Sequence, residues 1–168
     1  MSVRLRATTP ADLAFVTALE RDAYNREYIG QWTDEEHLAA IRGERAREHR
    51  VIEVEGRPGG YVICYRGEAI SPSIYIKRVL VADKERGIGQ VAVAQVLDDA
   101  FARPDVDFAW LLVRQWNARA QAVYRKLGFE RYDPPQWEAD ALAAYAEAPS
   151  PESFRMRIDA GAWRGRRR

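Results

Sequence analysis

The chain has 168 residues, 47% of them hydrophobic, and its 26 basic residues nearly balance its 25 acidic ones, for a net charge of +1. This length fits one ordinary domain with a substantial core. The balanced charge excludes a chain-wide field that would attract nucleic acid or an acidic membrane, so any anion site must be local. We expect neither nucleic acid nor a membrane as a partner.

Cysteine and histidine are scarce, which excludes further classes of protein. The single cysteine, Cys64, cannot form an internal disulfide and lies in an apolar run, so we expect a small core residue in a reducing compartment. His37 and His49 do not form a clustered metal-binding pattern, so no metal site is predicted. Because the N-terminus lacks an apolar leader and no apolar run reaches about 18 residues, the sequence predicts a cytoplasmic protein.

The first part of the chain alternates between helix and strand patterns. A proline after Thr9 and a capping-box pattern at residues 33–36 mark two helix starts. Runs of β-branched and aromatic residues mark the strands. In chain order, the expected elements are a strand at 3–6, a helix at 10–23, a helix from 33, and a hairpin of strands 50–55 and 61–65 around a turn at 56–59.

From residue 74 onwards the period changes several times between strand and helix. The elements expected there are strand 74–81, helix 88–101, strand 108–113, helix 117–127, a short strand from Phe129, helix 136–148 and strand 153–158. The continuous apolar run at 108–113 is typical of a strand covered on both faces, so it should be central. The sum is one α/β domain at residues 1–160, with a mixed, mostly antiparallel sheet of about six or seven strands flanked by helices.

Residues 161–168 form an Arg-rich C-terminal tail. Its arginines are Arg164, Arg166, Arg167 and Arg168. A nucleic-acid-binding tail has this composition, but short terminal charge runs are usually solvated. We expect a solvated tail.

A glycine loop joins strand 74–81 to the helix that follows. Gly87 and Gly89 would let backbone N–H groups approach a phosphate closely at the N-terminus of that helix. Lys84 and Arg86 would add positive charge beside them. A tight turn without a ligand needs the same glycines, so the loop alone does not decide the function.

The same loop also spells a dinucleotide-binding pattern, G-x-G-x-x-A, with Gly87, Gly89 and Ala92. That pattern needs an acidic residue at the end of the next strand to hold a ribose. Here the next strand ends in residues 113–116, Val-Arg-Gln-Trp, which contain no acid. The sequence therefore argues against a nicotinamide or flavin site.

A second pattern lies on helix 117–127. Asn117, Ala120 and Tyr124 share one helical face at about 100° per residue. An asparagine can donate to and accept from an amide-containing ligand, alanine lets such a ligand pass close, and the tyrosine carries a phenolic proton. Taken singly, Asn117 is better explained as a helix N-cap and Tyr124 as a core residue.

Together, the two patterns resemble the acetyl-CoA-binding core of the GNAT N-acetyltransferase superfamily. The family's loop, [Q/R]-x-x-G-x-[G/A], is matched by Lys84, Gly87 and Gly89, with lysine in place of the usual glutamine or arginine. The family's helix pattern, N-x-x-A-x-x-x-Y-x-x-x-G-F, is matched in full from Asn117 to Phe129. The resemblance covers roughly residues 74–132 and implies a GNAT-like fold and an acetyl-CoA-dependent N-acetyltransferase.

The resemblance also implies a role for each site residue. Backbone groups of Val79, Leu80 and Val81 would pair with the pantetheine arm of acetyl-CoA, with Asn117 and Ala120 on its other side. Tyr124 would be the general acid that protonates the CoA thiolate after direct attack by a neutral amine. The pyrophosphate would be held by the amides of Glu85, Arg86, Gly87, Ile88, Gly89 and Gln90, with the charge of Lys84 beside them.

The general base is not identified by sequence. Relatives often place a glutamate on the strand before the glycine loop, but residues 74–81 contain no acid and show Tyr75 and Lys77 instead. Carboxylates elsewhere could act through water, although each is more often a solvated surface group. The candidates are Glu53 and Glu55 on the hairpin, and Glu20 and Asp22 on the first helix.

The acceptor is expected to enter between the N-terminal helices and the hairpin. Tyr24, Tyr28 and Trp32 would line an amine pocket there or pack the core, and segment 134–149, with Trp137 and Tyr145, would cover it. Small amines, antibiotics and protein N-termini all remain candidate acceptors, and a homodimer is left open. The alternative function is a catalytically idle acyl-CoA-binding or partner-docking module of the same fold.

Overall fold

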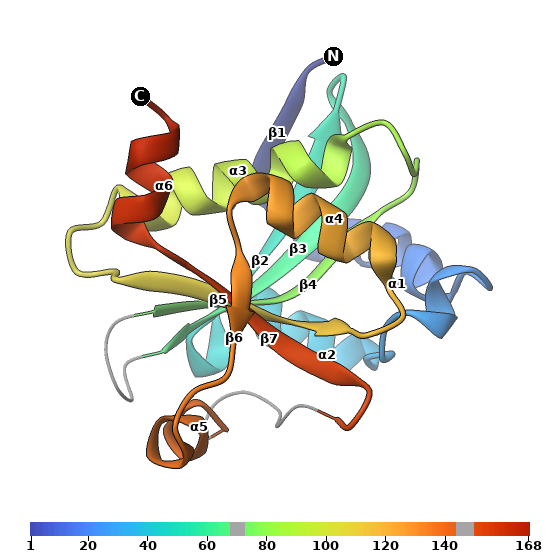
Figure 1. Cartoon of the computed structure of the whole chain (residues 1–168). Helices are drawn as coiled ribbons and strands as arrows, with labels where there is room; N and C mark the ends of the chain where they lie inside the picture. The colour runs from blue at the N-terminus through green and yellow to red at the C-terminus, as the bar shows by residue number, and fades with distance from the viewer. Residues whose placement is uncertain (68–72, 144–149) are drawn as a thin grey trace. The chain divides into compact units, whose positions relative to one another are not determined.

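The computed structural model describes residues 1–67, 73–143 and 150–168. Its seven strands form a mixed sheet in the order β1-β2-β3-β4-β5-β7-β6, flanked by helices (Figure 1). The expected α/β fold is therefore confirmed. By contacts, the chain divides into two compact units, Met1–Cys64 with Lys77–Gln95, and Tyr65–Ile76 with Val96–Arg168. Three elements run through both units: β3 (Arg57–Gly67), β4 (Ser73–Val81) and α3 (Ile88–Phe101).

The strands of the first unit form an antiparallel meander. β1 (Val3–Ala7) pairs with β2 (Arg47–Val54), which continues into β3. The turn between β2 and β3 consists of Glu55 and Gly56, both with positive φ, at 51° and 75°. Two such residues match the twist of a hairpin. The turn is thus shorter than the predicted 56–59, and Gly60 lies inside β3, where an added Cβ would collide with the carbonyl oxygen of Leu80.

The helices of the first unit follow β1. α1 (Leu13–Arg21) starts after a short 3-10 turn, η1 (Pro10–Asp12), and ends two residues before the predicted end. α2 (Asp34–Ile41) begins with the predicted capping box, because Thr33 and Glu36 exchange hydrogen bonds of 2.7 and 3.2 Å. α2 contacts both α1 and β2. Two more 3-10 turns, η2 (Asn25–Glu27) and η3 (Glu44–Ala46), complete this part of the chain.

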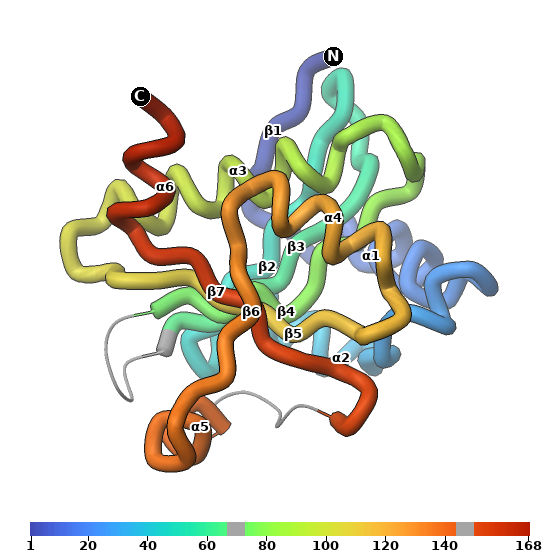
Figure 2. The backbone as a smooth tube through the Cα atoms, in the orientation of Figure 1, coloured from blue at the N-terminus to red at the C-terminus, as the bar shows by residue number. Residues whose placement is uncertain are grey.

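The second unit is built around β5 (Phe108–Arg114). β5 pairs in parallel with the start of β4, from Ser73 to Tyr75, and antiparallel with β7 (Ser153–Asp159). The short strand β6 (Glu130–Tyr132) pairs with the other side of β7, and the two lie side by side in Figures 1 and 2. β5 thus has a strand on either side, as its continuous apolar sequence predicts.

Two helices lie on opposite sides of these strands in Figure 1, α4 (Ala118–Leu127) and α5 (Gln136–Ala143). Leu142 of α5 packs against Tyr75, Phe108 and Trp110, which lie on one face of the sheet. Because side chains alternate along a strand, the residues between them face the other way. α5 coincides with the first eight residues of the predicted helix 136–148. Residues 144–148 of that helix lie outside the described ranges.

The C-terminal arginines are exposed, as the sequence predicts, but part of the predicted tail is helical. Residues 160–166 form a helix, α6 (Ala160–Arg166), anchored by the buried Trp163. Arg164 and Arg166 donate to the backbone oxygens of Phe101 and Lys126, at 2.8 and 2.7 Å. These oxygens belong to the last turns of α3 and α4, where carbonyl groups lack intrahelical donors and favour a cation. The arginines therefore cap two helices.

Cys64 is fully inside the core, at 1% exposure. Burial raises the pKa of its thiol to about 12. The thiol therefore stays protonated at neutral pH, and a reactive thiolate is not available. The predicted role as a small core residue is confirmed.

The helices of the described residues are short. The longest, α3, has 14 residues, whereas a transmembrane helix needs about 20 apolar residues. Within residues 1–67, 73–143 and 150–168, no helix is long and apolar enough to cross a membrane.

Candidate functional site

The glycine loop connects the end of β4 to the start of α3. Its backbone turns through two residues with positive φ, Glu85 at 66° and Gly87 at 74°. Gly87 is favoured there because only glycine adopts this conformation without strain. An added Cβ on Gly87, or on Gly89 in the first turn of α3, would meet no described atom within 4 Å. The loop therefore leaves open space where the sequence predicts a ligand.

The first turn of α3 supplies backbone donors beside these glycines. Val91 N donates to Gly87 O at 3.1 Å, which is the first bond of the helical ladder. The amides of Ile88, Gly89 and Gln90 precede it, so they have no acceptor within the helix. The first turn contains no acidic residue that would repel an anion. These features fit a pyrophosphate group.

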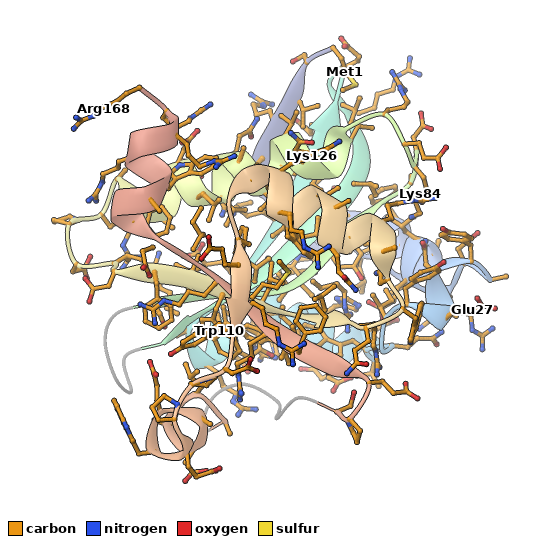
Figure 3. The ribbon with its side chains drawn as sticks, in the orientation of Figure 1. Met1, Glu27, Lys84, Trp110, Lys126 and Arg168 are labelled. Atoms are coloured by element: carbon orange, nitrogen blue, oxygen red, sulfur yellow. The ribbon has the colours of Figure 1, made fainter. Side chains whose placement is uncertain are left out.

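The two basic residues of the loop are engaged within the protein. Arg86 is exposed and pairs with Asp83 at 2.7 Å. Lys84 Nζ donates to Asn25 Oδ1 at 2.7 Å and to the backbone oxygen of Val81, and Figure 3 marks Lys84 on this loop. Their contacts brace the loop, so the predicted contact of Lys84 with a cofactor stays a prediction.

Asn25 is a residue that sequence reasoning missed. It is 3% exposed, and its side-chain nitrogen donates to the backbone oxygen of Leu19 at 2.8 Å while its oxygen accepts from Lys84. It thereby links the end of α1 to the glycine loop. The sequence carries no signal for this, because an asparagine in a short connection is usually solvated.

Helix α4 is fixed at both ends by residues of the second sequence pattern. Asn117 Oδ1 accepts from Ala120 N at 3.2 Å, so Asn117 is the N-cap, and Gly128 ends the helix with φ of 101°. The buried Gln121 donates to the backbone oxygen of Arg114 at 3.0 Å, which ties α4 to the end of β5. Because its oxygen is used as the cap, Asn117 offers its amide nitrogen as a donor to a ligand.

Tyr124 is half-buried on α4, with its ring 5.7 Å from that of Phe129. Burial raises the pKa of the phenol to about 12. The group is therefore protonated at neutral pH. Among the described residues, no hydrogen bond to its hydroxyl is found, so this proton remains available to a ligand.

Glu20 lies at the centre of a buried polar network in the first unit, at 1% exposure. Its donors are His37 Nε2 at 3.0 Å, Tyr61 Oη at 2.6 Å, Arg78 Nη1 at 2.7 Å and the backbone N–H of Trp32. Burial alone would raise the pKa of Glu20, but these hydrogen bonds and the charge of Arg78 outweigh it and lower the pKa to about 2. Because its pKa is low and both of its carboxylate oxygens already accept hydrogen bonds, Glu20 is a poor general base.

The network extends from Glu20 through two histidines to Thr8. His37 Nδ1 lies 3.2 Å from His49 Nε2, and His49 Nδ1 lies 2.8 Å from Thr8 Oγ1. One set of neutral tautomers satisfies the chain: Thr8 donates to His49, His49 Nε2 donates to His37, and His37 Nε2 donates to Glu20. Burial, together with neighbouring positive charge, lowers the pKa of His49 to about 3. His49 is therefore uncharged at neutral pH, and both histidines serve as links in this hydrogen-bonded chain.

The other candidate bases are also engaged. Arginine side chains hydrogen-bond to Glu53 and lower the pKa of that carboxyl. A carboxylate held in this way is less able to take a proton from an amine. The partners are Arg4 and Arg6 for Glu53, the backbone N–H of Ser2 for Glu55, and the backbone N–H of Tyr24 for Asp22.

The aromatic residues expected near the acceptor contact other rings and cations. Tyr24 stacks on Tyr28, with ring centroids 5.0 Å apart. Trp32 meets the edge of His37 at 5.2 Å and is surrounded by cations. Those cations are Arg47, Lys77 and Arg78, at 5.5, 5.9 and 5.3 Å from the Trp32 ring centroid.

The predicted cover of the acceptor pocket is only partly described. Trp137 lies on α5 and is 65% exposed. Tyr145 lies outside the described ranges. The role of this segment as a cover stays a prediction.

Solved structures with the same fold include several acyltransferases. Aminoglycoside acetyltransferase AAC(6')-Ib in complex with coenzyme A and kanamycin is 21% identical, with a TM-score of 0.81 over 99% of this chain and 100% of that one. Spermidine N-acetyltransferase from Vibrio cholerae with CoA and spermine is 18% identical, with a TM-score of 0.74 over 96% and 97%. Ard1 from Thermoplasma volcanium is 18% identical, with a TM-score of 0.69 over 95% and 98%. These likenesses show the shared fold.

The amino-acid sequence gives a separate line of comparison. No curated protein matches the chain. The model of the acetyltransferase (GNAT) family, however, matches residues 16–129, which include both the glycine loop and α4. Since this match covers more than half of the sequence, the chain belongs to the GNAT acetyltransferase family.

Proposed function

We propose that the chain is an acetyl-CoA-dependent N-acetyltransferase acting on the amine of a small molecule or peptide. The observation that carries the proposal is the open space beside Gly87 and Gly89 at the N-terminus of α3, in a chain of the GNAT family. The solved structures of the same fold that hold coenzyme A together with kanamycin or spermine support this choice of co-substrate.

In this proposal, three parts of the chain hold acetyl-CoA. The backbone of Val79, Leu80 and Val81 on β4 pairs with the pantetheine arm. Asn117 donates to the arm from α4, and Ala120 leaves room for it. The amides of residues 85–90 hold the pyrophosphate, where the N-terminus of α3 favours negative charge.

The reaction is a direct transfer. The amine nitrogen attacks the thioester carbon, the C–N bond forms, the C–S bond breaks, and a backbone donor on β4 stabilises the oxyanion. Tyr124 hydrogen-bonds to the departing sulfur and gives it a proton. The proton that the amine loses on forming the amide replaces the one that Tyr124 gives, so the phenol is restored.

A general acid of this kind accelerates a reaction by about 10² to 10⁴-fold. With a pKa of about 12, Tyr124 is a weaker acid than an unperturbed phenol. A thiol has a pKa near 8.5 and is therefore a stronger acid than this phenol, so the thiolate does not readily take the phenolic proton. Tyr124 acts first by stabilising the thiolate through a hydrogen bond.

The alternative function is a catalytically idle module that binds acyl-CoA. One observation favours it: β4 carries no acid, and Glu20 and Glu53, the buried candidates for a base, are held by hydrogen bonds that lower the pKa of each. An alkylamine with a pKa near 10.4 must lose its proton before it attacks. In an active enzyme that proton goes to water or to a group outside this set.

The test is a screen of amines and peptides with acetyl-CoA that detects the released thiol. We expect turnover with part of the panel, and a drop in kcat of at least tenfold in Tyr124→Phe while acetyl-CoA affinity is kept. Lys126→Gln, on the same helix, is the matched control and should keep full activity. Unchanged turnover in Tyr124→Phe would remove Tyr124 from its role.

Binding separates the two functions. An idle module is stabilised by acetyl-CoA but releases no thiol with any amine. An enzyme does both. If acetyl-CoA does not raise the melting temperature at all, both proposals are wrong.

A further inference from the structure

Arg155 is a buried cation in the middle of β7. It is 8% exposed, and its Nε is buried without a hydrogen-bond partner; within the described ranges its side chain forms no ion pair and no hydrogen bond. The carboxylates whose charge reaches it, those of Asp133 and Glu138, pair with Arg131 and Arg157 instead. Burial lowers the pKa of Arg155, yet a guanidinium remains charged at neutral pH.

Two aromatic side chains lie close to Arg155, one on β5 and one on β6. In the register of the strands it lies between Leu112 of β5 and Tyr132 of β6. Its guanidinium carbon is 5.8 Å from the ring centroid of Trp110, which Figure 3 marks among these strands. Trp110 in turn stacks on Tyr75 at 4.3 Å. We call Tyr65, Tyr75, Phe108, Trp110 and Tyr132 the aromatic cluster; the structure groups them on the face that Leu142 covers.

A second arginine on the same face of β7 shows what a satisfied cation looks like here. Arg157 lies 3.9 Å from the ring centroid of Phe108 and pairs with Asp159 at 2.7 Å and Glu138 at 3.8 Å. Two cations therefore meet the aromatic cluster, and the carboxylates that form ion pairs there serve Arg157. Arg155 is left with positive charge that no described side chain neutralises.

An unpaired buried charge is costly, so a chain that keeps one needs a compensating partner. A guanidinium matches a carboxylate in geometry, through two parallel N–H···O bonds. The partly buried rings of Tyr65 and Tyr132 would contact an apolar body at small entropic cost. The arrangement therefore fits a ligand that combines a carboxylate with an apolar or aromatic part.

We propose that Arg155 binds a carboxylate of the acceptor and that Tyr65 and Tyr132, the partly buried rings of the aromatic cluster, contact its apolar body, so that the acceptor is an amino acid. This inference rests on the proposed function, because the acceptor is the amine that is acetylated. Tyr75 of the cluster belongs to β4, four residues before Val79, whose backbone is proposed to hold the cofactor. Kanamycin and spermine, by contrast, carry several amines and no carboxylate.

The experiment compares amines that differ only in the carboxylate. The pairs are phenylalanine against phenethylamine, and 4-aminobutyrate against butylamine, with spermine as the polycation and phosphoethanolamine as a different anion. Acetyl transfer is followed by thiol release. We expect kcat/KM to be at least tenfold higher for the carboxylate member of at least one pair than for its partner and for spermine.

Three proteins are compared on that pair: the wild type, Arg155→Gln, and Arg131→Gln as an exposed control on β6. In Arg155→Gln we expect KM for the carboxylate substrate to rise at least tenfold, with kcat, KM for acetyl-CoA and the rate with the uncharged partner kept. A melting curve of each protein verifies folding. If Arg155→Gln does not fold, Arg155→Lys should show a smaller rise in KM, because it keeps the charge and loses the bidentate geometry.

The failures of the two proposals are distinguishable. Turnover that prefers spermine, phosphoethanolamine or the uncharged amines, or a preference for the carboxylate that survives in Arg155→Gln, overturns the role of Arg155 and leaves the acetyltransferase standing. No turnover with any amine overturns the proposed function. In that case, a melting temperature raised by phenylalanine in the wild type but not in Arg155→Gln would still support the carboxylate site.

Discussion

Glu20 in the first unit and Arg155 in the second are both buried charges, but their surroundings are opposite. Glu20 is 1% exposed and accepts from three side chains and one backbone N–H. Arg155 is 8% exposed and has no acceptor among the described residues. A buried charged side chain whose hydrogen bonds are all made within the protein has a structural role. A buried charged side chain without such bonds is a candidate to bind a ligand.

The pKa shifts express the same difference. Hydrogen bonds overcome burial at Glu20 and lower its pKa to about 2, so the charged form is favoured. At Arg155 burial prevails and lowers the pKa, so the charged form is disfavoured. Both pKa values are lowered, but a lower pKa favours the charged form of an acid and disfavours the charged form of a base. The charge of Glu20 is neutralised by partners within the fold, whereas the charge of Arg155 is not neutralised by any described side chain.

The largest effect is expected from Glu20→Gln. The substitution keeps the side-chain shape but leaves Arg78 buried without its counter-ion. Breaking a buried pair in this way costs about 3 to 5 kcal/mol, to be measured by urea unfolding at pH 7. Glu27→Gln, on an exposed part of the same unit, is the control and should stay within about 0.5 kcal/mol of the wild type. Equal effects of the two variants would show that the network does not stabilise the fold.

The pH dependence of stability tests the neutral end of the same network. His49 has a folded pKa of about 3, while an unfolded histidine has one near 6.5. Between these values the unfolded chain binds a proton that the folded chain does not, so stability is complete above pH 6.5 and falls as pH drops towards 3. From pH 7 to pH 5 the loss should be roughly 2 kcal/mol.

Glu20 does not contribute in that interval, because its own stabilisation is lost only below the unfolded pKa near 4.3. Urea unfolding at pH 7, 6 and 5 measures the slope. His49→Gln should be less stable than the wild type at pH 7, but its free energy of unfolding should no longer fall between pH 7 and pH 5. The same slope in both proteins would place the titrating group elsewhere.

The sequence predicted the local backbone structure of the candidate site. The pattern from Asn117 to Gly128 consists of a helix start and a helix stop, and α4 forms between them. The glycine loop was likewise readable, since Gly87 has the positive φ that glycine favours. Local motifs carry their own geometry, so no knowledge of the tertiary structure was needed for them.

Contacts between distant residues were not predictable in the same way. Glu20 meets His37, Tyr61 and Arg78, which come from three other elements. Its inward direction was readable, because it follows the fully buried Val16 by four residues on α1. Its partners were not, and a carboxylate without known partners is better interpreted as solvated.

The alternating sequence of β7 does not show which of its faces is covered. Phe154, Met156 and Ile158 alternate with Arg155 and Arg157, a pattern typical of a strand with one solvated face. Instead, the aromatic cluster and Leu142 of α5 lie on the face of the arginines. A strand pattern cannot show what a later helix will cover.

The smallest effect is expected from Arg155→Met, and it should have the opposite sign to that of Glu20→Gln. Removing an unpaired buried charge relieves its desolvation, so the variant should be more stable by about 1 kcal/mol, which raises Tm by roughly 2 to 4 °C in a chain of this size. Arg131→Met, an exposed control, should change Tm by about 1 °C or less. Thermal unfolding measures both.

A carboxylate ligand should then make the Tm of the wild type higher than that of Arg155→Met. Saturating phenylalanine, or 4-aminobutyrate if that is the better substrate, should raise Tm of the wild type and leave Arg155→Met unchanged, because ligands stabilise only the protein that binds them. The bound carboxylate would give Arg155 what Glu20 already has, a partner for its charge. If Arg155→Met is instead destabilised as strongly as Glu20→Gln, Arg155 is a structural residue, and the contrast between the two buried charges disappears.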